Sequence, residues 1–186
     1  KDDYNFERNP RFISKATYSA PDATIRSEIP HNLKVGDSVI INNITDSTNT
    51  DINIVGAGGS GYNETITTTN FQSYHREDDG ANGLGYNSGY DNQQTTDHQE
   101  ISGPLSNDND ASFSGELYIF NPSDTTFVTH FMATGHGMEA GTSKVSTQLH
   151  TAGYFNTTSA VDEFQFKFNS GNIDSGTVKL YGIKDS

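Results

Sequence analysis

The most regular feature of the sequence is an alternation of apolar and polar positions, which is what a β-strand with one buried face requires. The clearest case is residues 164–168, where three phenylalanines alternate with Gln165 and Lys167. The run Thr177–Ile183 alternates in the same way. No segment combines apolar residues at helical spacing with recognisable caps, so the pattern predicts an all-β chain.

Further strands are predicted on both sides of the middle of the chain. The turn Asn121–Asp124, with a proline at a position that turns favour, separates two of them. The regular spacing of strands after residue 110 is typical of a sandwich or a barrel. These further strands cover residues 11–18, 24–29, 37–44, 115–120, 125–134 and 144–154.

Two polar stretches, residues 45–63 and 72–110, interrupt the strand pattern. The second is longer than the loops usually found inside one compact domain. We therefore predict two parts: residues 1–70 form a small β module for attachment, and residues 71–186 form an outer antiparallel β-sandwich. The polar stretch 72–110 is predicted to contain a linker and an irregular start of the second part.

The composition excludes several classes of function. Twenty-four acidic and 11 basic residues give a formal net charge of −13, which disfavours binding to nucleic-acid phosphates. The chain has no cysteine, and therefore no disulfide framework, thiolate metal site or cysteine nucleophile. No apolar run approaches the ~20 residues of a membrane span. We expect neither nucleic acid nor membrane insertion.

Motifs for catalysis and for cofactor binding fail in their context. Gly56–Gly61 matches the glycine pattern of dinucleotide-binding folds, but β-prone residues follow where that pattern needs a helix. Counted from Asp108, positions 6 and 12 of a calcium-binding EF-hand loop are Phe113 and Ile119, which cannot serve. An irregular calcium site in the acidic loops is left as an alternative. We predict no catalytic residue, no cofactor and no metal.

Tyrosines form the first set of candidate binding residues. Tyr74, Tyr86 and Tyr90 lie among glycine and asparagine residues. Tyrosines with small polar neighbours can stack on sugars, so these three are candidates for contact with a glycan. The alternative interpretation is that they anchor loops onto the sheet.

Histidines form the second set. His130 and His136 lie six positions apart, and His150 could meet them in space. Three neutral imidazoles can hold a divalent ion, but His130 lies in a predicted strand with large apolar neighbours. We therefore take His130, His136 and His150 as candidates for a subunit interface, with the axis of a trimer as one form of it. The alternative interpretation is that they are half-buried structural histidines.

The C-terminal part contains a characteristic series of segments. In order, they are Gly115–Pro122, Ala152–Val161, Phe164–Phe166, Ser170–Ile173 and Ser175–Lys184. This series resembles a module found at the C-terminus of virion proteins of tailed bacteriophages, frequent in marine and cyanobacterial phages. The resemblance implies a virion structural protein with a jelly-roll-like sandwich, of a kind that commonly forms trimers at fibre tips or on the particle surface. No catalytic residue carries over from that pattern.

A second likeness lies near the N-terminus. Pro30–Val39 resembles the H-G-L-x-V-G-D-x-V segment of small β modules in phage structural proteins, and Gly61–Thr65 resembles the G-Y-N-G-T that follows it. Asn32 and Glu64 replace glycines of that pattern, so the module is either altered or completed by a neighbouring chain.

Three functions are compatible with these observations. The first is a non-enzymatic capsid decoration or head-fibre protein on the virion surface, a homotrimer in contact with other virion proteins. The second is a tail-fibre or receptor-binding tip that recognises host-surface glycans. The third is a carbohydrate-binding module of non-viral origin. The small size and the absence of a coiled-coil or collagen-like shaft in the sequence favour the first.

Overall fold

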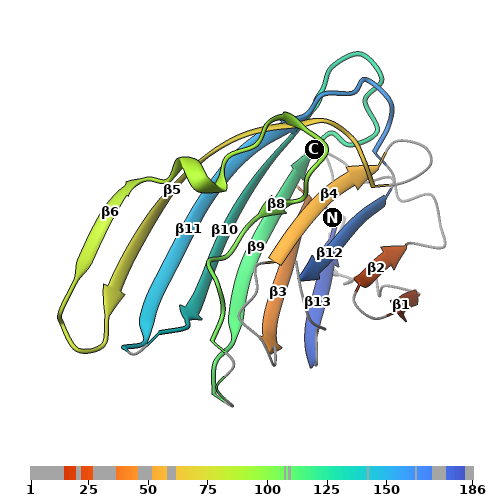
Figure 1. Cartoon of the computed structure of the whole chain (residues 1–186). Coiled ribbons are helices and arrows are strands. Elements are labelled where there is room, and N and C mark those ends of the chain that lie inside the picture. Colours follow the sequence, from red (N-terminus) through yellow and green to blue (C-terminus); the bar gives the residue numbers. More distant parts are fainter. Residues whose placement is uncertain are drawn as a thin grey trace, which may run out of the picture.

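The computed structural model describes an antiparallel β protein (Figure 1). The described residues are 15–19, 22–26, 37–45, 52–57, 62–106, 108, 110–141, 143–161, 163–168 and 175–182. Their only helical element is the 3₁₀ turn η1. The elements are β1 (Lys15–Ser19), β2 (Asp22–Arg26), β3 (Asp37–Thr45), β4 (Ile52–Ala57), β5 (Ile66–Arg76), β6 (Asn82–Tyr86), η1 (Ser88–Tyr90), β7 (Gln93–Thr95), β8 (Gln99–Glu100), β9 (Phe113–Phe120), β10 (Thr129–Glu139), β11 (Val145–Phe155), β12 (Glu163–Phe168) and β13 (Ser175–Tyr181).

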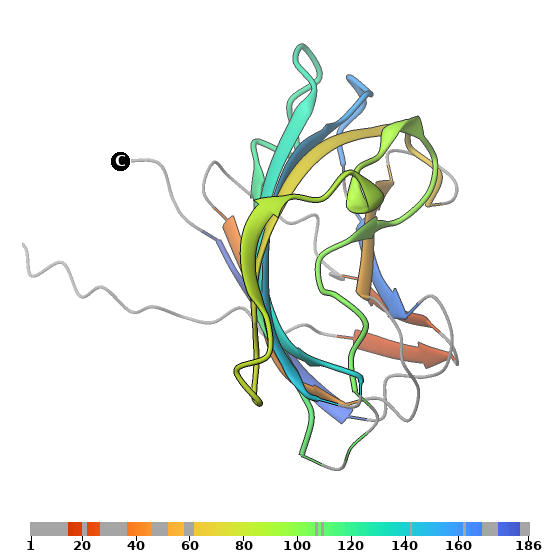
Figure 2. The same cartoon turned by 60° about the vertical axis from the view of Figure 1, so that its left-hand side comes forward.

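The strands form two sheets. The larger has the order β13-β3-β9-β10-β11-β5-β6, with β7 pairing with β5, and the smaller has the order β1-β2-β12-β4-β8. Every strand pair is antiparallel, and neither sheet closes on itself. The larger sheet is strongly curved, and the smaller sheet lies on its concave side (Figure 2). The predicted all-β class is thereby confirmed for the described residues.

The apolar core lies on the concave side of the larger sheet. Along β10, residues 129, 131, 133, 135 and 137 are buried, whereas the residues between them are exposed or half-buried. This is the alternation expected of a strand with one buried face. The predicted face of Phe164, Phe166 and Phe168 on β12 is confirmed, because all three are buried in the same core cluster as Phe113 and Phe131.

Most predicted strands of the C-terminal half are present with small changes of bounds. β9 covers the segment predicted at 115–120, and β11 covers the one predicted at 144–154 apart from Lys144. β13 covers residues 177–181 of the segment predicted at 177–183; Gly182 follows the strand, and Ile183 lies outside the described residues. β10 begins at Thr129 rather than at residue 125, so that Phe127 lies before the strand and is exposed. The turn at 121–124 is confirmed by a hydrogen bond of 3.0 Å from the Asp124 N–H to the Asn121 carbonyl.

Residues 72–110 contain sheet strands and buried chain rather than a linker, so that prediction is wrong. They include the second half of β5, which pairs with β11, and β6, which extends the larger sheet. After β8 the chain crosses the concave face of the larger sheet with Ile101 and Leu105 buried. Two glycines of β10 allow this close approach. A Cβ on Gly135 would lie 2.2 Å from the Ile101 carbonyl oxygen, and one on Gly137 would lie 2.6 Å from Leu105 Cδ2.

Strands from the first 70 residues are paired with later strands in both sheets. β3 lies between β9 and β13, and β12 lies between β2 and β4. The predicted division after residue 70 falls within β5. The attachment role of residues 1–70 stays a prediction, since much of that segment, including Pro30–Gly36, lies outside the described residues.

Candidate functional site: the outer face of the larger sheet

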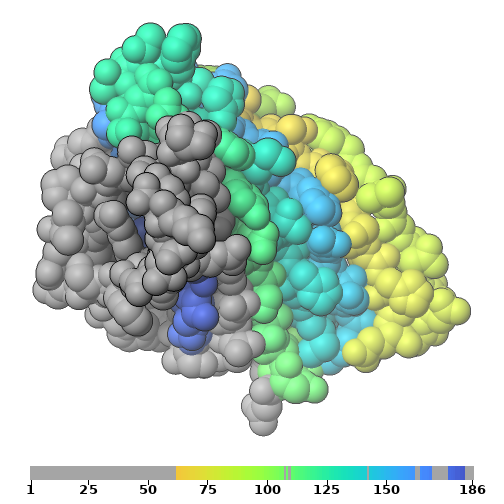
Figure 3. All heavy atoms as spheres, turned by 180° about the vertical axis from the view of Figure 1, so that it is seen from behind, coloured from red at the N-terminus to blue at the C-terminus, as the bar shows by residue number. Residues whose placement is uncertain are grey.

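On the side of the larger sheet that faces away from the smaller one, the surface of the four neighbouring strands β10, β11, β5 and β6 is here called the outer face (Figure 3). The registers of β5, β6, β10 and β11 place directly opposite residues on the same side. The outer face consists of residues 67, 69, 71, 73 and 75 of β5; 82, 84 and 86 of β6; 130, 132, 134, 136 and 138 of β10; and 146, 148, 150, 152 and 154 of β11.

The outer face carries exposed apolar side chains. Leu84 is 74% exposed, Tyr86 65%, Met132 53% and Phe71 47%. Four large apolar side chains on one face of one sheet exceed the scattered single residues that are normal on a protein surface. This clustering favours a role in contact with a partner.

The positions of the outer face include no carboxylate, ammonium or guanidinium group. None of its positions is aspartate, glutamate, lysine or arginine; they are histidine, threonine, serine, asparagine, glutamine, tyrosine, phenylalanine, leucine, methionine and alanine. The whole chain, by contrast, has a formal net charge of −13. Three carboxylates adjoin this face: Asp79 lies 3.1 Å from His75, Asp91 accepts a hydrogen bond from Tyr86, and Glu116 on β9 lies opposite Thr134. The Glu116 carboxylate accepts a hydrogen bond from Tyr118, which raises the pKa of that phenol.

A shallow pocket of about 410 Å³ opens on the outer face where β9, β10, β11 and β5 lie side by side. The ring of Phe120 on β9 forms one wall, and His130 and Tyr154 form a tilted pair with ring centres 6.0 Å apart. Met132 and Ala152 lie directly opposite each other in the middle. The lining is almost wholly apolar, and the pocket contains no charged group.

The three predicted histidines all lie on the outer face, as a common binding surface would need. His130 contacts Tyr154, and His136 lies 3.0 Å from the Ser146 hydroxyl. His150 stacks on Phe71 with ring centres 4.7 Å apart. They occupy different rows of the sheet, and no group of three or more potential metal ligands occurs among the described residues. Their assignment to a subunit interface stays a prediction.

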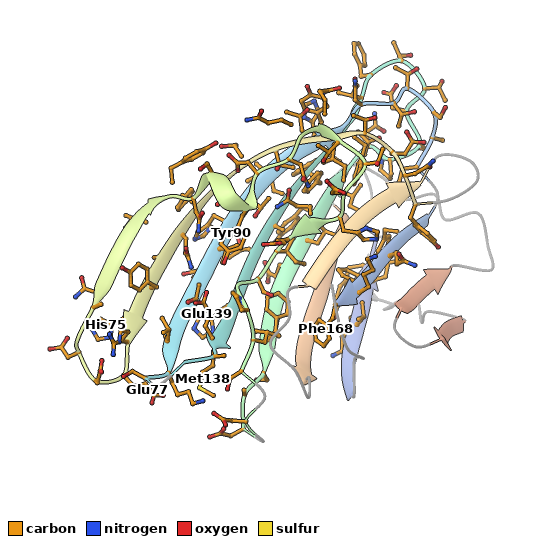
Figure 4. The ribbon with its side chains drawn as sticks, in the orientation of Figure 1. His75, Glu77, Tyr90, Met138, Glu139 and Phe168 are labelled. Atoms are coloured by element: carbon orange, nitrogen blue, oxygen red, sulfur yellow. The ribbon has the colours of Figure 1, made fainter. Side chains whose placement is uncertain are left out.

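Sequence reasoning missed one histidine of the same face. His75 lies near the end of β5, where Figure 4 shows it, and its imidazole is 3.1 Å from the Asp79 carboxylate. Residues 66–76 give only a weak strand signal, because Ile66, Phe71 and Tyr74 are their only large apolar or aromatic residues apart from His75.

The three tyrosines do not share one face. Tyr86 lies on the outer face, where its hydroxyl bonds to the Asp91 carboxylate. Tyr74 lies on the concave face, with its ring over Gly83. Tyr90 projects from η1 over β11 on the concave side (Figure 4). A single glycan platform of all three is therefore not formed, and contact of each with a glycan stays a prediction.

The acidic loops hold pairs of charges. Asp108 forms a salt bridge with Lys144. Hydrogen bonds from Lys144 and Ser106 lower the pKa of the Asp108 carboxyl. Hydrogen bonds from Ser143 and from the Gly80 N–H lower the pKa of Asp78, which also pairs with Arg76. Both carboxylates thus form hydrogen bonds and ion pairs with neighbouring residues of the protein. Where the dinucleotide pattern would need a helix, residues 66–76 form the strand β5.

Comparison with protein-family models, with curated proteins and with solved structures finds no match for this chain. Among the described residues, no helix has the length and apolar character of a membrane span.

Proposed function

We propose that this chain is a non-enzymatic structural protein of a tailed-phage particle, displayed on the virion surface as a capsid decoration or head-fibre protein. The outer face supports this proposal most directly, because its large apolar side chains are exposed and none of its positions is an acidic residue, a lysine or an arginine. Exposed apolar side chains grouped on one face suit contact between protein surfaces. The C-terminal resemblance to phage virion modules gives the setting in which that contact occurs.

We further propose that the two sheets form a jelly-roll-like β-sandwich. The core cluster supports this, because it joins Phe113, Leu117 and Phe131 of the larger sheet to Phe164 and Phe166 of the smaller one. The crossing of strands between the sheets also fits, since β12 belongs to the smaller sheet and β13, next in sequence, to the larger. A sandwich of this kind offers one free face of the larger sheet to partners.

The test is to remove the gene from the phage that encodes it and to compare purified particles. We expect mass spectrometry to detect the chain in wild-type particles, and electron microscopy to show surface density that is missing from the deleted ones. Purified protein added back should restore that density. Absence of the chain from purified infectious particles would contradict the proposal.

A tail-fibre or receptor-binding tip is the second candidate, and the exposure of Tyr86 on the outer face favours it specifically. In that case a panel of host-surface glycans should bind the protein, and Tyr86→Ala should abolish binding while Tyr90→Ala has a smaller effect. Binding to glycans unrelated to a phage host would instead point to the third candidate, a non-viral carbohydrate-binding module. No binding across the panel would contradict both.

A further inference from the structure

We infer that the chain cleaves its own backbone between Asn121 and Pro122, in the turn that joins β9 to β10. This reaction involves only the chain itself and is therefore independent of the proposed function. The turn lies beyond the ends of both strands, in the teal loop at the top of Figure 2. Asn121 is exposed there, and its φ of 49° lies in the left-handed region, which few residues other than glycine adopt. Backbone conformations of this kind cluster at functional sites.

The proline after Asn121 determines which reaction is open to the asparagine. In most sequences the backbone N–H of the following residue attacks the side-chain amide carbon of an asparagine, which is thereby deamidated. Proline has no N–H, so Pro122 closes this route. The remaining ring closure joins the side-chain nitrogen of Asn121 to its own backbone carbonyl carbon, and it breaks the bond to Pro122.

Asp124 contacts both of the groups that this reaction changes. The Asn121 Nδ2 donates a hydrogen bond of 2.7 Å to the Asp124 carboxylate, and the Asp124 N–H donates one of 3.0 Å to the Asn121 carbonyl oxygen. The carboxylate therefore lies within the distance that a proton acceptor needs. The N–H polarises the carbonyl and stabilises the negative charge that develops on its oxygen. Hydrogen bonds from the N–H groups of Thr126 and Phe127 lower the pKa of Asp124, so its carboxylate is ionised at neutral pH.

The step needs no further reactant. The Asn121 Nδ2 forms a bond to the Asn121 carbonyl carbon while one of its protons passes to the Asp124 carboxylate. The bond from that carbon to the Pro122 nitrogen then breaks, and the nitrogen takes the proton from Asp124. The products are a chain of residues 1–121 that ends in a five-membered cyclic imide and a chain of residues 122–186 that begins with a secondary amine. Water later opens the imide to a terminal carboxylate.

The two products are expected to stay together. β9 and β10 remain paired up to Phe120 and His130, next to the cleaved bond. Pro122 is buried, and its carbonyl accepts a hydrogen bond of 2.6 Å from the Val161 N–H. The cleaved protein therefore keeps the size and the strand signal of the uncut one, and denaturing conditions are needed to separate its fragments.

The experiment incubates the purified full-length protein at physiological temperature and neutral pH for several days and measures intact masses after denaturation. We expect two fragments whose masses add up to the 20.3 kDa of the uncut chain, with no water added at early times. Asn9–Pro10 is the internal control, because Phe12 stands three positions after its asparagine, where the turn has Asp124. Cleavage after Asn9 should be at least about a hundredfold slower, which is the effect of a positioned acid–base group.

Two variants and one change of conditions test the assignment of roles. Asn121→Gly should remain uncut and folded, because glycine adopts the positive φ but has no attacking nitrogen. Asp124→Asn should slow cleavage about a hundredfold, since it keeps an oxygen for the N–H groups of the turn but removes the proton acceptor. Circular dichroism at the assay temperature checks that both variants fold. Concentrated urea should reduce cleavage of the wild type after Asn121 to the rate found after Asn9, whether or not the variants fold.

A wild type that stays uncut over this period would overturn the inference. Equal rates at the two asparagine–proline bonds, fragments from Asn121→Gly, or equally fast cleavage in urea would overturn it too. Cleavage of folded Asp124→Asn at the rate of the wild type would refute the role of Asp124. None of these outcomes depends on whether the chain is found on virions, so the proposed function is tested separately.

Discussion

At the scale of single residues, two glycines of β10 determine where the chain lies after β8. Gly135 and Gly137 leave room for the backbone of Ile101 and the side chain of Leu105 against the concave face. The Ser106 N–H then donates to the Met138 carbonyl at 2.8 Å, which joins the segment to the same strand. Glycine is thus required here by close approach of the backbone and not by a turn.

Gly135→Ala is expected to destabilise the fold, because its Cβ would lie 2.2 Å from the Ile101 carbonyl oxygen. Overpacking of this kind costs about 1–3 kcal/mol. Urea unfolding followed by circular dichroism measures the change. Gly85→Ala on β6 is the control, since nothing lies within 4 Å of its Cβ, and its free energy of unfolding should stay equal or rise slightly. Equal stability of wild type and Gly135→Ala would show that the segment does not rest on β10.

Asp124 gives a prediction for acidic pH. Hydrogen bonds from the N–H groups of Thr126 (2.6 Å) and Phe127 (3.0 Å) hold the pKa of its carboxyl below the usual value. A pKa lowered by folding contributes stability above the unfolded value of about 3.9, and that contribution is lost as the pH falls through the folded pKa.

Asp124→Asn should therefore melt at a lower temperature than the wild type at neutral pH, and the difference should shrink as the pH falls below about 4. Thermal melts from pH 7 to acid check this. Asp97→Asn provides a comparison at an exposed acid. A difference between wild type and Asp124→Asn that is constant across this range would contradict the assignment.

At the scale of elements, β12 depends most on its aromatic face. Phe164 and Phe166 meet edge to face with ring centres 5.3 Å apart, and both are buried. The opposite face is also covered, because Gln165 is buried and lies 3.0 Å from the His98 imidazole. Both faces of β12 therefore contain buried side chains, whereas the alternation of its sequence predicts that the face of Gln165 and Lys167 is exposed to solvent.

Phe166→Ala should lower the free energy of unfolding by about 3–5 kcal/mol, the usual cost of removing a buried phenyl ring. Phe166→Asp should prevent folding altogether, because it buries an unpaired charge. Chemical unfolding measures the first variant, and solubility with near-ultraviolet circular dichroism reports on the second. Lys167→Ala, at a half-buried neighbour, should behave nearly as the wild type. A soluble Phe166→Asp protein that melts cooperatively would refute the core assignment.

At the scale of the whole molecule, the pairing of distant strands holds the two halves of the chain together. β3 separates β9 from β13, and β12 has β2 and β4 as its neighbours. A chain that lacks residues 1–70 loses the four strands β1 to β4 and the first half of β5. The outer face would also lose Thr67 and Thr69, which line its pocket.

The fragment of residues 71–186 should therefore fail to melt cooperatively, whereas the full chain should show a single transition. Circular dichroism and calorimetry on both proteins measure this. A fragment that melts cooperatively, with the strand signal of the full chain, would instead support the sequence-based division into an attachment module and an outer part.

The sequence by itself determined the all-β class, most C-terminal strands and the burial of the β12 phenylalanines, because these depend on the local alternation of apolar and polar residues. It also marked His130, His136 and His150 as residues of one surface. It did not reveal β5 and β6, because Thr68, Asn70 and Gln72 of β5 and the two glycines of β6 stand where the alternating pattern needs apolar residues. Only the tertiary structure decided that these strands extend the larger sheet, that Ile101 and Leu105 are buried and that exposed apolar side chains of three strands share one face. Each of these depends on which strands pair across a long stretch of sequence, and local preference carries no information about such pairing.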